Sequence, residues 1–232
     1  VALFSFNDSI GAHPFGGLTA DPAGNLYGTT YDQGPSNDGS VFKFLPASGT
    51  YVTLFAFDGD NGQNPTGSLV LDAAGNVFGT TYNGGGDGDG EVFAISVSGQ
   101  FFPIAFFDGD NGANPTGRLL HDASGNIYGI TSNGGANGDG TVFSIPLTGG
   151  VPTTLATFSG GNGGNGSLPF AGLTLSSDGS TLYGTTTLGG AKNDGTVFSV
   201  PITGGAPTTL ANFNITTGVT PLAALTLVGS TL

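Results

Sequence analysis

The chain has 232 residues, of which 45 are glycine and 13 are proline, while charged residues make up only 8%. Sixteen acidic and three basic residues give a formal net charge of -13 at pH 7, which argues against nucleic acid or an anionic membrane as a partner because too few cations could meet the phosphates. The lack of cysteine excludes disulfides, thiolate zinc sites and cysteine nucleophiles.

One sequence pattern recurs along the chain from its first residues to its last. Successive repeats begin 51, 50, 54 and 52 residues apart, as measured at Pro14, Pro65, Pro115, Pro169 and Pro221. We divide residues 1–232, as a single repeat domain, into a terminal strand and loop (1–12), four complete repeats (13–63, 64–113, 114–167 and 168–219) and an incomplete fifth repeat (220–232). Because the chain lacks methionine and breaks off within a repeat, we expect it to be a piece of a longer protein.

Each complete repeat is predicted to contain four short strands, which we call A to D. In the second repeat, strand A is expected over 67–71 and strand B over 76–81, followed by a Val-Phe pair in strand C and an apolar, aromatic run in strand D. Gly-rich turns separate the strands, since glycine adopts the positive φ of tight turns. Strand B also carries a glycine after its aromatic residue, where neighbouring backbones are expected to approach closely.

A four-stranded antiparallel unit that recurs about every 50 residues predicts an all-β fold, namely a β-propeller whose blades pack through their Phe and Tyr side chains. A parallel β-solenoid is the alternative, because residues 83–91 read NGGGDGDGE and resemble a calcium-binding nonapeptide turn. Such turns follow one another about every nine residues in a solenoid, whereas this cluster recurs about once in fifty. The propeller is therefore the preferred fold.

The segments GNLYGTTYDQG, DGSVF and GNVFGTTYNGGGDGDGEVF resemble the Gloeobacter and Verrucomicrobia repeat, and the resemblance covers essentially the whole chain. The fourth repeat departs from the pattern by one inserted residue within 178–181. The resemblance implies a bacterial protein that is exported, and is then secreted or attached to the cell surface. It implies no activity and no catalytic residues. We expect no insertion of this segment into a membrane.

The order of the strands predicts an acidic face. In an up-and-down blade the A–B and C–D turns lie at one end of the strands, and the B–C and D–A loops lie at the other. Four acidic residues fall in A–B turns, whereas twelve fall on or beside the opposite end: Asp8, Asp32, Asp38, Asp58, Asp60, Asp87, Asp89, Asp108, Asp110, Asp139, Asp194 and Glu91. The loop end is therefore predicted to be strongly electronegative.

Three interpretations of the acidic face stay open. In the first, the carboxylates only shape turns and keep the protein soluble. In the second, the acidic face binds calcium, which is the one cofactor that the sequence suggests. Asp87, Asp89 and Glu91 alternate with glycine and could supply its oxygen ligands. In the third, a glycan binds through carboxylates and stacked aromatic rings, and the candidate residues are Tyr31, Tyr82, Asp58, Asp60, Asp108 and Asp110.

Arg118 is an unusual residue of the predicted strand A, because Gly17 and Ser68 occupy its position in the preceding repeats. It could bind an anion or pair with nearby acids, so it joins the candidate ligand-binding residues. The two histidines, His13 and His121, stand where a structural role is sufficient, and no catalytic constellation is assigned.

We therefore expect an extracellular or cell-surface propeller that serves in binding or adhesion through its acidic loop face, with a glycan or another surface protein as its partner. One alternative is a self-assembling subunit of an extracellular fibre or surface layer. A second, less favoured alternative is an enzyme that processes glycosides with a pair of carboxylates.

Overall fold

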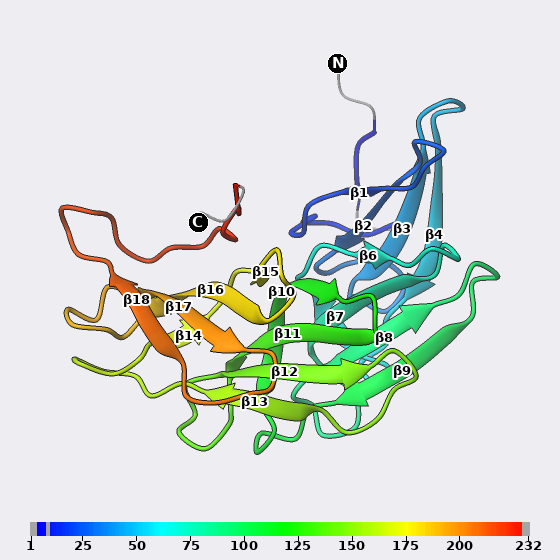
Figure 1. Cartoon of the computed structure of the whole chain (residues 1–232). Coiled ribbons are helices and arrows are strands. Elements are labelled where there is room, and N and C mark those ends of the chain that lie inside the picture. The colour runs from blue at the N-terminus through cyan, green and yellow to red at the C-terminus, as the bar shows by residue number, and fades with distance from the viewer. Residues whose placement is uncertain (1–3, 8–9, 229–232) are drawn as a thin grey trace. The chain divides into compact units, whose positions relative to one another are not determined.

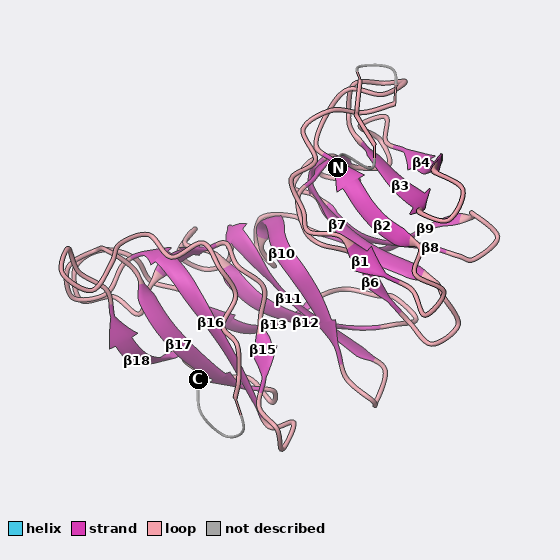
Figure 2. Ribbon diagram, turned by 90° about the horizontal axis from the view of Figure 1, so that it is seen from above, coloured by secondary structure: helices cyan, strands magenta, loops and turns pink. Residues whose placement is uncertain are grey.

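The computed structural model describes residues 4–7 and 10–228, in which every regular element is a β-strand (Figure 1). Contacts between Cα atoms divide the chain into unit 1 (Val1–Phe106) and unit 2 (Phe107–Leu232), and the two are described separately. Each unit holds two antiparallel sheets, here called blades (Figure 2). No helix within the described ranges has the length and apolar character needed to span a membrane.

Unit 1 contains blades 1 and 2, whose strands are hydrogen-bonded in chain order. Blade 1 consists of β1 (Thr19–Ala20), β2 (Leu26–Thr30), β3 (Ser40–Leu45) and β4 (Thr50–Ala56). Blade 2 consists of β5 (Gln63–Pro65), β6 (Val70–Leu71), β7 (Val77–Asn83), β8 (Glu91–Ile95) and β9 (Phe101–Phe106). Both β5 and β6 pair with β7, so together they make up strand A of this blade.

Unit 2 contains blades 3 and 4 and follows the same plan. Blade 3 consists of β10 (Ala113–His121), β11 (Asn126–Asn133), β12 (Thr141–Pro146) and β13 (Thr153–Thr157). Blade 4 consists of β14 (Ser167–Pro169), β15 (Thr174–Leu175), β16 (Thr181–Leu188), β17 (Thr196–Pro201) and β18 (Thr208–Asn212). Here β14 and β15 both pair with β16.

The predicted four-stranded antiparallel repeat is confirmed in both units. Strands B, C and D are continuous in every blade, and strand C pairs with both B and D. The β-solenoid alternative is contradicted, because it requires parallel pairing of successive coils, whereas the named strands of the described residues pair only antiparallel.

Strand A is more irregular than the sequence predicts, although in blade 3 it spans nine residues. In blade 2 the ladder is interrupted between Pro65 and Val70, and in blade 3 the register shifts between Thr116 and Leu120. The interruption is the place where strands A of neighbouring blades meet: a Cβ on Gly117 would lie 2.7 Å from the backbone nitrogen of Gly172 in unit 2. The residues in the middle of strand A, where the ladder to strand B is interrupted, therefore form the contact between blades.

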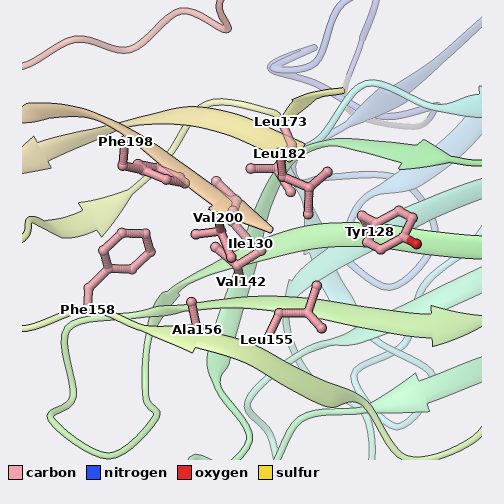
Figure 3. Close-up of a cluster of buried hydrophobic side chains, with 10 residues drawn as sticks. All are labelled: Tyr128, Ile130, Val142, Leu155, Ala156, Phe158, Leu173, Leu182, Phe198 and Val200. Carbon is pink, nitrogen blue, oxygen red and sulfur yellow. The ribbon is translucent and has the colours of Figure 1, made fainter. Parts of the chain in front are cut away.

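Phenylalanines form the interface between neighbouring blades, as the sequence predicts. In unit 2, Phe158 follows strand D of blade 3 and meets Phe198 of blade 4 edge-on at 4.9 Å between ring centroids (Figure 3). In unit 1, Phe57 and Phe93 repeat this contact at 5.2 Å. All four rings are fully buried, and the removal of such side chains from water is a main source of the stability of the fold.

The glycine of strand B accommodates a ring and not a neighbouring backbone. Gly79 pairs with Phe93 across the sheet, and a Cβ on Gly79 would lie 2.6 Å from Cζ of that ring and 2.8 Å from Cδ2 of Leu69. The same arrangement occurs at Gly28, Gly129 and Gly184. The Tyr/Phe-Gly motif of strand B is thus the partner of the Val-Phe motif of strand C.

Candidate functional site

The D–A loops hold two of the predicted binding residues in structural turns. In unit 1, the backbone N–H of Asp58 donates to Oδ1 of Asn61 at 3.0 Å, and the N–H of Asn61 donates back to Oδ1 of Asp58 at 3.3 Å. Asp108 and Asn111 make the same reciprocal pair in unit 2, at 3.3 and 2.9 Å. These bonds support the interpretation that Asp58 and Asp108 shape their loops.

Asp60 and Asp110 differ from them, although they lie only two residues further along. Both side chains are exposed, and no hydrogen bond or ion pair engages their carboxylates within the described parts of the chain. The reciprocal bonds beside them hold the loop backbone in place. Each loop therefore presents, beside its hydrogen-bonded aspartate, one exposed carboxylate that makes no hydrogen bond within the described residues, on a preorganised turn.

The two predicted tyrosines lie in unit 1 near the ends of strand B. Tyr31 directly follows β2 and is half-buried, and its ring centroid lies 6.0 Å from that of Phe15, whose side chain is 59% exposed. Tyr82 is also half-buried and belongs to β7. Sequence reasoning missed Phe15, although the smaller Thr66 and Thr116 occupy its position in the next two repeats.

Arg118 lies in β10 of unit 2 and is exposed. The seven candidate ligand residues are thus divided between the units, with Tyr31, Tyr82, Asp58 and Asp60 in unit 1 and Asp108, Asp110 and Arg118 in unit 2. No hydrogen bond or salt bridge given for the described residues joins any two of them. Neither unit by itself gathers all seven into one pocket.

The predicted calcium ligands do not converge. Asp87 is exposed, Asp89 is partly exposed and Glu91 is fully buried in β8. Within residues 4–7 and 10–228, no group of three His, Cys, Asp or Glu side chains is placed to hold a metal ion. Asp8, another acid of the predicted face, lies outside the described residues.

Glu91 stands where the other blades carry a hydroxyl residue. In blade 3, for example, Thr131 of strand B and Thr141 of strand C share a hydrogen bond of 2.8 Å between their hydroxyls. In blade 2 the corresponding hydroxyl of Thr81 and both carboxyl oxygens of Glu91 are buried without a hydrogen-bond partner. Burial raises the pKa of Glu91 to about 8, because desolvation disfavours the charged form.

A concave site that the sequence did not predict lies between blades 1 and 2 of unit 1. The cavity has a volume of about 650 Å³, and the A–B turns and strands of both blades line it together with the C–D turn of blade 2. Leu54, Leu71 and Val77 are apolar lining residues, and Asp21, Asp72, Ser96 and Lys43 are polar ones. It lies at the end of the strands opposite to the B–C and D–A loops.

Lys43 is the one cationic side chain of this lining. It projects from β3, and its Nζ lies 3.9 Å from Oδ2 of Asp21 and 5.0 Å from the ring centroid of Tyr27. The corresponding positions of the later repeats hold Ala94, Ser144 and Ser199. Lys43 is the sequence signal that could have revealed the site. It is the one lysine among four equivalent strand C positions, in a chain that has only three basic residues.

The two carboxylates of the cavity lining are fixed by their turns. Asp21 Oδ1 accepts the N–H groups of Ala23 and Asn25, both at 2.9 Å, and its Oδ2 accepts the Asn25 side chain at 2.8 Å. The side-chain bond from Asn25 is the largest influence on the pKa of Asp21, which is lowered. Asp72 accepts the same three bonds in blade 2. The polar edge of the cavity is therefore preorganised.

A model of the Gloeobacter/Verrucomicrobia repeat matches residues 1–180 and 106–232. A search of curated protein sequences found no match.

Solved structures resemble the chain in fold at low sequence identity. One chain of a nidogen/laminin complex is 19% identical with a TM-score of 0.59, and the match covers 90% of this chain and 67% of that one. A gluconolactonase from Xanthomonas campestris is 15% identical with a TM-score of 0.52, covering 81% and 62%. The extracellular domain described for a hybrid two-component system of B. thetaiotaomicron is 12% identical with a TM-score of 0.57, covering 91% and 24%. Because these neighbours are β-propellers, they confirm the predicted fold class.

Proposed function

The chain belongs to the Gloeobacter/Verrucomicrobia repeat family, and on that premise we propose that it is an extracellular or cell-surface β-propeller that binds a glycan through its acidic loop face. The family resemblance implies export, and one structural neighbour is itself an extracellular domain. Other neighbours include a partner in a protein complex and an enzyme, so the fold alone does not select a function.

The exposed carboxylates of Asp60 and Asp110 carry this proposal. They occupy the same position in consecutive D–A loops, and both loops are held by the reciprocal Asp–Asn bonds described above. A turn that is already ordered loses little conformational entropy on binding. Carboxylate oxygens on such a turn can accept hydrogen bonds from sugar hydroxyls. The fibre subunit and the glycoside-processing enzyme stay predictions.

A glycan array probed with the labelled chain tests the proposal. We expect binding to one class of glycan, and we expect Asp60→Asn and Asp110→Asn each to weaken it, with about a tenfold loss for the double variant. Asp178→Asn is the control, because it removes the same charge from an A–B turn and every hydrogen bond to that side chain ends at Oδ1, which asparagine keeps. Binding to no glycan, or equal binding by all variants, would refute the acidic face as the site.

A further inference from the structure

The cavity between blades 1 and 2 has the size and build of a small-molecule site. Its volume of about 650 Å³ falls within the range of about 300 to 1,000 Å³ that is usual for ligand pockets, and like them it combines an apolar floor with a few placed polar groups. We use the term apolar floor for the lining residues Leu54, Leu71 and Val77. The site lies at the other end of the strands from Asp60, so it is separate from the proposed loop surface.

The ammonium group of Lys43 is poorly satisfied by the protein. Its separation of 3.9 Å from Asp21 Oδ2 is too long for a hydrogen bond, and the described residues offer it no other acceptor. The Tyr27 ring below it provides only a cation–π contact at 5.0 Å. The side chain is 27% exposed and lines the cavity. Its N–H donors are thus available to an acceptor that enters the cavity.

The charges of the lining select against a strongly charged ligand. An anion would meet Asp21 and Asp72 beside Lys43, in a protein whose formal net charge is -13. A cation would displace the lysine from its carboxylate neighbour. A neutral ring with many hydroxyls avoids both penalties. Its hydroxyls accept from the ammonium and donate to Asp72, whose Oδ2 accepts a single bond from the protein, while its C–H face covers the apolar floor.

We infer that this cavity binds one neutral hexopyranose unit. Lys43 donates to a ring hydroxyl, Asp21 and Asp72 form the polar edge, and Leu54, Leu71 and Val77 contact the apolar face of the ring. The first and second repeats thereby form one sugar-binding site together, independent of the loops at the other end of the blades.

Saturation-transfer NMR on the whole chain tests this inference, with the methyl glycosides of glucose, galactose and mannose as probes and methyl glucuronide as the anionic comparison. We expect a neutral glycoside to bind at millimolar concentration and more strongly than the glucuronide. Lys43→Ser should weaken binding about tenfold, because one charge-assisted hydrogen bond contributes about that factor to the affinity. Because blades 3 and 4 carry serine at this position, the variant is expected to fold.

Two further variants sharpen the test. Ala74→Trp places a bulky side chain into the cavity from an exposed turn and should abolish binding without removing a charge. Lys192→Ser removes an exposed lysine from a loop of blade 4 and should leave binding unchanged. Absence of binding by all three neutral glycosides, stronger binding of the glucuronide, or undiminished binding by Lys43→Ser and Ala74→Trp would overturn the inference. Asp60→Asn and Asp110→Asn should not affect this site, so its failure can be told from failure of the loop surface.

Discussion

The residue before the opening proline of each repeat adopts a left-handed backbone conformation. The φ angles are 50° at His13, 57° at Asn64, 56° at Asn114, 50° at Leu168 and 52° at Thr220. Asparagine, aspartate and histidine tolerate this region, whereas bulky apolar residues are strained there. Asparagine at this position is therefore unstrained, whereas Leu168 of the fourth repeat has a strained backbone conformation.

Leu168→Asn should stabilise the protein by about 1 kcal/mol, because it relieves the strain while the backbone bonds of this residue to Asp139 and Thr187 are kept. The free energy of unfolding from urea denaturation measures the effect. Leu168→Ala is the control, since alanine keeps the strained Cβ and only removes the side chain. An equal gain from Leu168→Ala would contradict the explanation by backbone strain.

Glu91 makes stability depend on pH in a direction opposite to that of an ordinary paired carboxylate. Its folded-state pKa of about 8 lies above the ordinary value of 4.5, so between these values the unfolded chain releases a proton that the folded protein retains. Stability is therefore highest below pH 4.5 with respect to this group, and it falls as the pH rises toward 8, by at most about 1.4 kcal/mol per pH unit.

Glu91→Gln should remove this fall, because the amide has no proton to lose. Urea denaturation at several pH values between 4.5 and about 8 compares the slopes of the two proteins, and the variant should be the more stable one at the upper end. Glu91→Thr restores the hydroxyl residue found in blades 3 and 4 and should also flatten the profile. A slope that is unchanged in both variants would show that other groups cause it.

Strands B and C form a matched pair of elements. The glycine that follows the aromatic residue in strand B leaves room for the phenylalanine of strand C, whose ring lies over it and against the leucine of strand A. The sequence shows both motifs and their spacing. It cannot show that the ring occupies the space over the glycine, because that depends on the antiparallel register.

Gly79→Ala should destabilise unit 1 by about 2 kcal/mol, because the new methyl group would overlap Cζ of Phe93 at 2.6 Å. In a well-packed interface, the side-chain and backbone shifts that relieve such an overlap are unfavourable. The shift of the thermal midpoint reports the loss. Gly86→Ala is the matched control in the same unit, because its Cβ would meet nothing closer than 3.8 Å. A loss of similar size in both variants would mean that glycine itself, and not the ring over it, matters.

At the scale of the whole molecule, the blades separate two kinds of surface. The B–C and D–A loops carry most of the acidic residues, and several of these, such as Asp58 and Asp108, are used to build turns. The other end of the strands carries fixed Asx turns and, in unit 1, the cavity beside Lys43. The candidate sites therefore lie at opposite ends of the strands, which the net charge alone could not show.

The sequence by itself determined the repeat, its four strands, their antiparallel order and the all-β class, because these follow from local periodicity and from glycine-rich turns that recur about every 50 residues. Only the tertiary structure decided that Glu91 is buried, that Asp87 and Asp89 do not join it, and that Lys43 faces a cavity. The reason is that burial and cavity shape depend on side chains from different blades, and their packing is set by contacts between residues far apart in the chain.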